Sequence, residues 1–92
     1  MARIYQSATM GDADVLVAIV DAQGMADLLV HRVSSWGLAH GDARWFITRD
    51  RQDATAVVHF TSPGFAQVNV CFVASYGEAG WQTDSKFRGR FG

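Results

Sequence analysis

Gly11-Asp-Ala-Asp-Val-Leu-Val17 is the first of six copies of one pattern in this chain of 92 residues. Each copy has Gly or Gln two residues before an alanine, and the apolar positions follow that alanine. The six alanines are Ala13, Ala26, Ala39, Ala54, Ala66 and Ala79, with spacings of 13, 13, 15, 12 and 13 residues. Such regular self-similarity is typical of a repeat architecture, in which each unit is one small supersecondary element.

Each unit continues from its alanine into a short run of β-branched and aromatic residues, which favours a strand. The predicted strands are Val15–Val20, Leu28–Val33, Trp45–Thr48, Ala56–Thr61 and Val68–Val73. Gly, Asp, Ser and Pro lie between these runs, where they favour turns. Ile4-Tyr5 and Ala79–Trp81 have the pattern of half units at the two ends, so we predict about six repeats.

Residues two apart along each predicted strand are apolar, as in Ala13, Val15, Val17 and Ile19, and this period indicates one buried core face. Arg32 interrupts the pattern, and we expect it at a rim where its guanidinium reaches water. The opposite face is also rich in apolar residues. We therefore expect the chain's own tail or a second copy of the protein to cover part of it.

The predicted fold is a single all-β domain over residues 1–83, followed by a tail over residues 84–92. We expect its strand-turn repeats of about 13 residues to form a small closed or nearly closed antiparallel β-meander, because closure leaves no exposed sheet edge. Ile4-Tyr5 and Ala79–Trp81 are then expected to lie side by side and close the ring. A short parallel β-solenoid, with one coil for each unit, is the alternative.

The repeated units and the closing segment Gly77-Glu-Ala-Gly-Trp81 resemble a bacterial family of short proteins with tandem Gln-Ala-Asp repeats that end in Gln-Ala-Gly-Trp, a domain of unknown function. The resemblance covers about residues 3–81. This chain has Gly instead of Gln in most units, and His40, Thr55 and Gln67 replace the repeated Asp. The resemblance implies an all-β repeat fold and supplies no catalytic residue.

The composition excludes several classes of protein. Eight Lys and Arg against nine Asp and Glu give a net charge of -1, so wrapping of nucleic acid is not expected. The longest apolar run, Val15–Val20, is far shorter than the roughly 18 residues of a membrane span. A lone cysteine, Cys71, allows no internal disulfide. We expect a cytoplasmic protein without a transmembrane segment, a metal or another cofactor.

Two groups of residues are candidates for catalysis. His31, His59 and Cys71 occupy the same position in their units, where they suit a transition metal or a Cys-His pair if the fold brings them together. His40 and Asp42 lie on a two-residue insertion in the third unit, and an Asp beside a His suits proton handling. The structural alternatives are a half-buried position for the first group and a β-bulge for the second.

The tail alternates cations with aromatic residues: Lys86, Arg88 and Arg90 lie among Phe87 and Phe91. This alternation is typical of weak binding to nucleic acid or to an anionic membrane. Alternatively, the tail is a frayed terminus or a strap whose phenylalanines cover the apolar outer face.

These observations favour a non-enzymatic binding or self-assembly module. We expect adhesive residues in the turns, namely Met25, Trp36, Phe65 and Tyr76. The expected partner is a second copy, most simply in a homodimer, or an unidentified protein or small ligand. Two alternatives remain: a small Cys/His or metal-assisted hydrolase that uses the candidates above, and a weak nucleic-acid or lipid binder that uses the tail.

Overall fold

Seven strands follow one another in the computed structural model, which describes residues 2–39 and 41–92. They are β1 (Ala2–Gln6), β2 (Val15–Ile19), β3 (Leu28–Arg32), β4 (Arg44–Ile47), β5 (Ala56–Phe60), β6 (Val68–Phe72) and β7 (Gly80–Trp81). All five full strands and both half units expected from the sequence contain one of these strands, to within a few residues at each end. The fold is therefore all-β, with seven strands instead of six.

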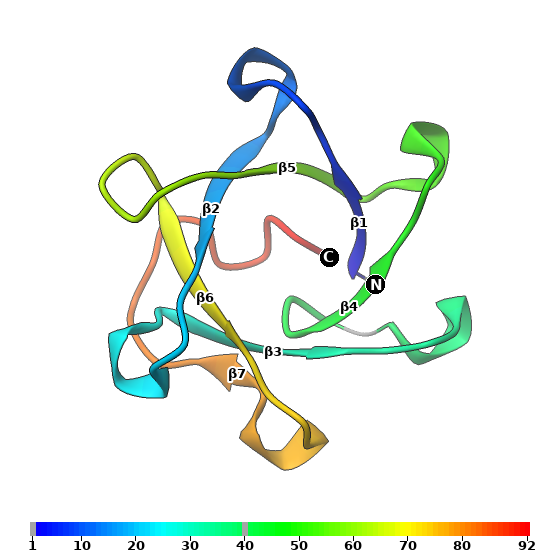
Figure 1. Cartoon of the computed structure of the whole chain (residues 1–92). Helices are drawn as coiled ribbons and strands as arrows, with labels where there is room; N and C mark the ends of the chain where they lie inside the picture. The colour runs from blue at the N-terminus through cyan, green and yellow to red at the C-terminus, as the bar shows by residue number, and fades with distance from the viewer. Residues whose placement is uncertain (1, 40) are drawn as a thin grey trace.

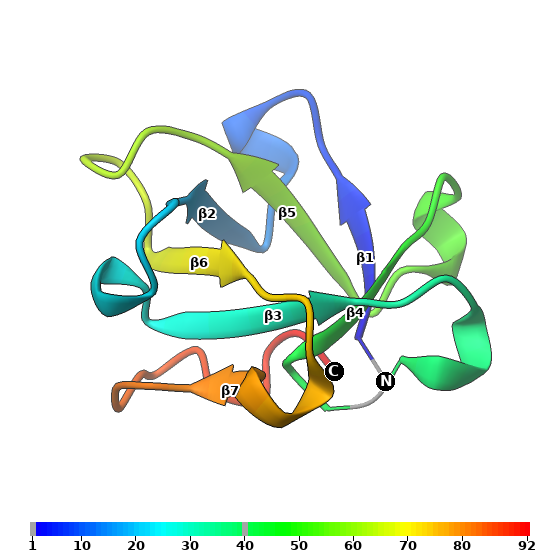
Figure 2. The ribbon, with the colours of Figure 1, turned by 60° about the horizontal axis from the view of Figure 1, so that its bottom comes forward.

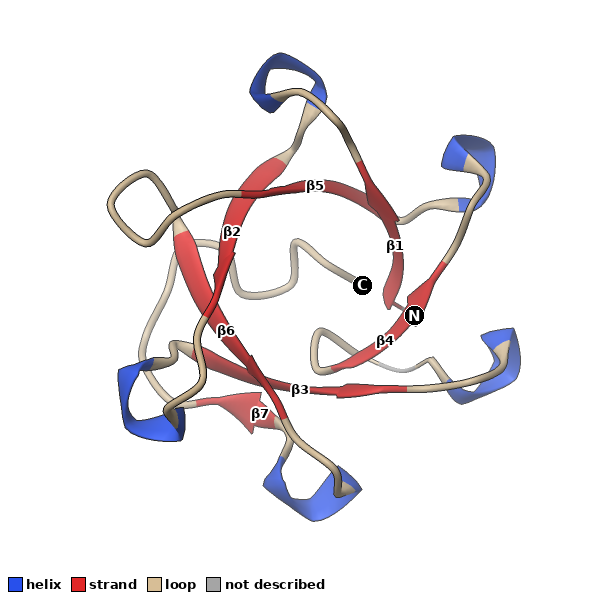
Figure 3. Ribbon diagram, in the orientation of Figure 1, coloured by secondary structure: helices blue, strands red, loops and turns tan. Residues whose placement is uncertain are grey.

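A short arm connects each strand to the next, and most arms contain one 3-10 turn that points away from the ring (Figure 3). The turns are η1 (Met10–Asp12), η2 (Gln23–Met25), η3 (Trp36–Leu38), η4 (Arg51–Asp53) and η5 (Tyr76–Glu78). The repeated alanine ends each turn: Ala13 donates its backbone N–H to the carbonyl of Met10 at 3.2 Å, and Ala26 does the same to Gln23 at 3.1 Å. The alanine was expected to be a packing position, and it also closes the turn.

The residue after the repeated alanine joins its arm to a neighbouring strand in four of the units. Asp14 donates its N–H to the carbonyl of Val57 at 2.7 Å, and its carboxylate accepts the N–H of Val57 at 3.0 Å. The same two-way pair forms between Asp27 and Asn69, Thr55 and Arg3, and Gln67 and Leu16. A side-chain oxygen therefore replaces a strand carbonyl at the end of the ladder, which explains why Thr and Gln can stand in place of the repeated Asp.

The strands form one ring in the order β4-β1-β5-β2-β6-β3-β7, and β4 also pairs with β3. Neighbours among the first six strands are all parallel. Except for β3 and β4, which pair directly, each strand lies two places along the ring from the strand before it in the chain, so the chain makes two circuits (Figure 1). The predicted antiparallel meander is wrong. The solenoid is wrong too, because one unit does not make one coil.

The length of the arms explains the difference from a meander. Residues 7–14 connect β1 to β2, whereas a tight hairpin needs only two residues. Eight extended residues reach about 26 Å, more than the roughly 17 Å of a five-residue strand. The arm is therefore long enough to return the chain to the start of a parallel strand. The alternation of apolar residues is the same for both strand directions, so it did not distinguish them.

Closure of the ring also differs from the expectation. β1 lies between β4 and β5, with Ile4 opposite Ile47 on one side and Ala56 on the other. β7 does not touch β1 in the sheet: Trp81 pairs with Leu28 in β3, antiparallel. The predicted pairing of Ile4-Tyr5 with Ala79–Trp81 is therefore wrong. The ring closes through the β3–β4 pair instead (Figure 2).

The inward-facing side chains form three layers. From one strand to the next around the ring, the register of the parallel pairs shifts by two residues. One residue from each of the six strands therefore lies at each level of the barrel. The middle layer is fully buried and consists of Ile4, Val17, Val30, Trp45, Val58 and Val70. The layer at the strand amino ends consists of Ala2, Val15, Leu28, Ala43, Ala56 and Val68. Its alanines leave room for further side chains.

The tail fills that room. Phe87 is buried and Phe91 is completely buried, and both belong to the same core cluster as the two layers. The rings of Phe91 and Trp45 lie 5.2 Å apart between centroids, and the C-terminus lies inside the ring in Figure 1. The expectation that these phenylalanines cover the outer face is wrong, because they close the amino end of the barrel.

The outer face is covered by the arms themselves. Ala26, Leu29, Cys71 and Val73 form a second buried cluster, against which Val20 and Ala79 pack. Ala26 follows η2 and Ala79 follows η5, so these arms fold back onto the sheet. No part of this cluster comes from the tail, so the arms and not the tail cover this part of the face. Contact with a second copy stays a prediction.

Candidate binding surface at the carboxyl end of the barrel

The third inward-facing layer lies where the parallel strands end, and it is open. Its residues, which we call the carboxyl mouth, are Gln6, Ile19, Arg32, Ile47, Phe60 and Phe72. Ile19 and Ile47 are 40% and 41% exposed, although the layer beneath them is fully buried. Parallel strands bring all their carboxyl ends to one end of a barrel, which is where barrel proteins commonly bind ligands.

Arg32 is the only charged residue of the carboxyl mouth. Its guanidinium carbon lies 4.4 Å from the centroid of the Phe72 ring, and it meets no acidic side chain among the residues that the structure describes. Stacking on an aromatic face leaves the N–H groups at the edge of the guanidinium free. The expectation that Arg32 lies at a rim is met, since the residue is exposed.

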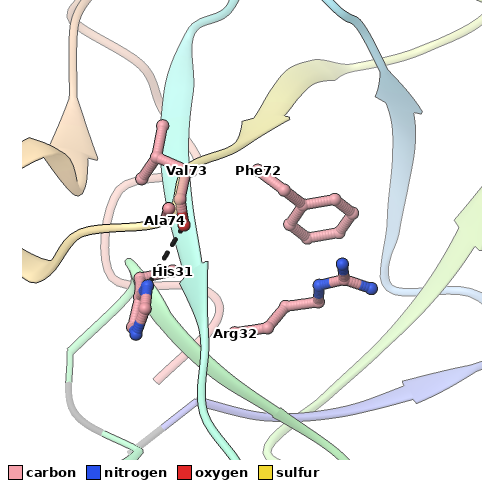
Figure 4. Close-up of a pocket in the computed structure, with 5 residues that line it drawn as sticks. All are labelled: His31, Arg32, Phe72, Val73 and Ala74. Carbon is pink, nitrogen blue, oxygen red and sulfur yellow. Dashed lines mark hydrogen bonds between the residues drawn. The ribbon is translucent and has the colours of Figure 1, made fainter.

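A hollow of about 380 Å³ lies beside this stack, lined by His31, Arg32, Phe72, Val73 and Ala74. Figure 4 shows Arg32 alongside the Phe72 ring and His31 on the other side of the β3 ribbon. Nδ1 of His31 lies 3.1 Å from the carbonyl oxygen of Val73. A carbonyl only accepts hydrogen bonds, so Nδ1 carries the proton and Nε2 has the lone pair in the neutral ring.

Two of the four predicted adhesive residues contact the barrel's cationic side chains. Tyr76 lies 4.5 Å from the ring of His31, and the guanidinium of Arg44 lies 4.4 Å from the Tyr76 centroid. Arg3 stacks over Trp36 at 4.8 Å. Both aromatic rings are therefore partly used within the fold, although each remains nearly half exposed.

Met25 and Phe65 are the most exposed large apolar side chains, at 70% and 68%. They lie on the β2–β3 and β5–β6 arms, which are neighbours around the ring in Figure 1. Trp36 lies on the β3–β4 arm across the ring from them. The β6–β7 arm with Tyr76 lies between the β2–β3 and β3–β4 arms in Figure 1, so the four predicted residues lie on four consecutive arms of the ring.

The two histidines and the cysteine proposed for catalysis do not come together as one group of three. His59 is on β5, which has β1 and β2 as neighbours, whereas His31 and Cys71 are on β3 and β6. Nδ1 of His59 lies 2.9 Å from the carbonyl of Ser7. Cys71 is buried, with its thiol 3.7 Å from the carbonyl of Asp21. Within residues 2–39 and 41–92, no three His, Cys, Asp or Glu side chains are arranged to hold a metal ion.

Asp42 holds the tail in place. Its carboxylate accepts hydrogen bonds from the Trp81 indole at 2.9 Å, from the N–H of Phe91 at 3.2 Å and from the N–H of Gly89. Thr55 adds a hydroxyl hydrogen bond of 2.6 Å to the carbonyl of Phe91. His40, the other residue proposed on the insertion, lies outside the described residues.

The cations of the tail remain at the surface while its aromatic residues face the core. Lys86 lies over the outer side of the Phe87 ring, with Nζ 5.5 Å from its centroid. Arg88 is exposed, and Arg90 lines a polar hollow of about 250 Å³ with Asp14, Val15 and Thr55. Buried phenylalanines are not free to stack on nucleic-acid bases. The tail therefore offers exposed cations but no exposed phenylalanine for binding single-stranded nucleic acid.

The carboxyl mouth was missed because Ile19, Phe60 and Phe72 were assigned to the core face, and Arg32 was expected at a rim without a link to them. Ile19, Arg32, Phe60 and Phe72 are each six residues after a repeated alanine, so their equivalence is visible in the sequence. The missing information was strand direction: in an antiparallel meander, equivalent positions alternate between the two ends of the ring.

The protein is thus a closed parallel barrel whose chain makes two circuits. A family model described as the 7(1) septoil knot domain matches residues 1–82, and the chain belongs to this family of short proteins. No curated protein and no solved structure matches the chain. No helix of the described residues is long and apolar enough to cross a membrane.

Proposed function

We propose that this protein is a non-enzymatic binding module whose recognition surface is the carboxyl mouth. The observation that carries the proposal is the abrupt change in exposure within the barrel, from a completely buried middle layer to Ile19 and Ile47 at 40% and 41%. Exposed apolar side chains that face a common axis favour an apolar ligand, because binding removes their surface from water.

The adjacent hollow supports the same proposal. Its volume of about 380 Å³ falls within the range of small-molecule sites, roughly 300–1,000 Å³. Phe72, Val73 and Ala74 supply apolar walls, and Arg32 and His31 supply polar groups. Such a combination favours binding with a defined orientation. The scattered positions of His59 and Cys71 give the hydrolase alternative no comparable support.

Fluorescence of the neutral dye Nile red tests this proposal. We expect the dye to brighten with the wild-type chain and to lose most of that signal with Ile19→Ser/Ile47→Ser. Met25→Ser/Phe65→Ser is the matched control, because it removes two exposed apolar side chains from the arms, and it should keep the signal. If the control loses the signal and the mouth variant keeps it, the arms are the binding surface and the proposal fails.

Self-association through the β2–β3 and β5–β6 arms is a second candidate function. Met25 and Phe65 are 70% and 68% exposed, and these neighbouring arms could present them together to the same patch of a second copy. We expect analytical ultracentrifugation to detect a dimer at high micromolar concentration and Met25→Ser/Phe65→Ser to be monomeric. A wild-type monomer at that concentration, or a dimer that survives the double substitution, contradicts this assignment.

The repeat itself supports a finer view of the family. We infer that the Gly/Gln-x-Ala-Asp unit is the family's sequence signature, because the alanine ends the arm's turn and the next residue pairs with a neighbouring strand. We also propose a cytoplasmic location, which the single buried cysteine supports, since secreted domains of this size commonly rely on disulfides.

A further inference from the structure

We infer that the ligand of the carboxyl mouth is a small organic acid with one carboxylate on an apolar body. This inference rests on the proposed binding function and adds the chemical class of the ligand. Two features of the site point to it: the uncompensated charge of Arg32 and the apolar side chains that surround that charge.

The charge of Arg32 favours an anion. The other five residues of the carboxyl mouth are Gln6, Ile19, Ile47, Phe60 and Phe72, so this layer contains no acidic side chain. The guanidinium carbon lies over the Phe72 ring, 4.4 Å from its centroid, and this contact limits the positions that the guanidinium can take. The N–H groups at the guanidinium edge then form a planar fork that matches the two oxygens of a carboxylate.

The surroundings of Arg32 favour an apolar body on that anion. Phe72, Val73 and Ala74 line the hollow next to the guanidinium, and Ile19 and Phe60 belong to the same layer of the mouth. A small inorganic anion would leave these surfaces in water. An aliphatic or aromatic acid covers them and places its carboxylate at Arg32, so one ligand satisfies both features.

The volume of the hollow suits a small ligand. About 380 Å³ lies at the lower end of the range for small-molecule sites. We therefore assign a free organic acid of moderate size as the occupant, with the apolar residues of the mouth receiving the part of its body that extends from the hollow.

The test compares octanoate with 1-octanol, which share an apolar chain and differ in charge. Each is titrated into the full-length ¹⁵N-labelled protein while the backbone amides of Arg32, Phe72 and Val73 are followed by NMR. We expect octanoate to bind about tenfold more tightly than 1-octanol, because a charge-assisted pair adds to the apolar contact. Acetate, which lacks the apolar chain, should bind much more weakly than octanoate.

Substitutions then assign the difference to one side chain. Arg32→Gln should abolish the preference for octanoate and leave the affinity for 1-octanol unchanged. Arg88→Gln, which removes an exposed charge from the tail, should leave both affinities as they are. The amide spectrum of each variant verifies that the barrel is folded.

The possible results separate this inference from the proposed function. Equal binding of octanoate and 1-octanol at the mouth overturns the carboxylate assignment and leaves a binding surface for neutral apolar ligands. Equal binding of acetate and octanoate overturns the apolar body. If neither eight-carbon probe shifts the mouth amides, the proposed function fails together with its ligand class.

Discussion

The carboxylate of Asp42 accepts the indole N–H of Trp81 at 2.9 Å, and this contact joins the insertion of the third unit to the last strand of the barrel. The same carboxylate accepts backbone N–H groups of Gly89 and Phe91. One side chain thus fixes both β7 and the tail that follows it. The insertion, which suggested a catalytic loop, has a structural role in closing the amino end of the barrel.

Replacement of Asp42 by alanine should therefore loosen the tail and destabilise the protein. Three N–H donors lose a charged acceptor, and we expect a loss of about 2–3 kcal/mol in the free energy of unfolding. Urea denaturation measures this loss, and hydrogen exchange should accelerate at Gly89 and Phe91. Asp84→Ala is the control, since Asp84 is an exposed carboxylate of the tail itself. Similar stability of the two variants would show that Asp42 does not hold the tail.

We expect Phe91 to contribute as much to the stability of the fold as a core residue in the middle of a strand. Its side chain is completely buried against Trp45 and Trp81, so Phe91→Ala should cost about 3–5 kcal/mol. Phe65→Ala removes the same side chain from an arm where it is 68% exposed, and it should change stability by less than about 0.5 kcal/mol. Thermal or urea unfolding of both variants compares them directly. A Phe91→Ala protein as stable as Phe65→Ala contradicts the closed amino end.

The two-way pair between Asp14 and Val57 predicts different effects for two substitutions at one position. Asp14→Asn keeps a side-chain oxygen that can accept the Val57 N–H, and we expect only a small change in stability. Asp14→Ala leaves that N–H without its partner and should cost about 1–2 kcal/mol. Hydrogen exchange at Val57 should be faster in the alanine variant than in the asparagine variant. Equal exchange rates would argue against the pair.

Removal of residues 1–10 tests the two-circuit barrel. β1 lies between β4 and β5, so its loss leaves two unpaired strand edges in the middle of the sheet. We expect the 11–92 fragment to aggregate or to lose cooperative unfolding, as monitored by tryptophan fluorescence during urea denaturation. A cooperative transition near the midpoint of the full-length chain would contradict this arrangement.

Strand positions could be predicted from the sequence because their signals are local. The alanines at a spacing of about 13 residues mark the end of each turn, and the residues after them alternate between core and arms. Asp14 and Gln67 differ in chemistry, yet each offers an oxygen at the same position. The repeat therefore revealed where the strands lie, including those at both ends, although it was interpreted as about six units where the fold has seven strands.

The order of the strands could not be predicted from the same signals. Val57 pairs with Tyr5 in β1, and its N–H donates to the carboxylate of Asp14, which precedes β2. No local sequence pattern predicts either partner. The tail posed the same problem, since the partners of Phe91 are Trp45, Trp81 and Asp42, far away in the sequence. Spacing alone therefore grouped His31, His59 and Cys71, which the fold separates, and left the carboxyl mouth unrecognised.

The two-circuit path has a consequence for how the protein folds and how it is degraded. Ile4 pairs with Ala56 and Val17 with Val68, residues far apart in the chain, whereas β3 and β4 are consecutive strands that pair. Most strand pairs therefore need distant parts of the chain. Such high contact order imposes a large entropic cost on the folding transition state and slows folding. In the opposite direction, none of the strands β1 to β6 can detach alone, because each of them lies between two strands of the other circuit. We expect slow folding after synthesis, slow global unfolding, and resistance to proteases that depend on local opening.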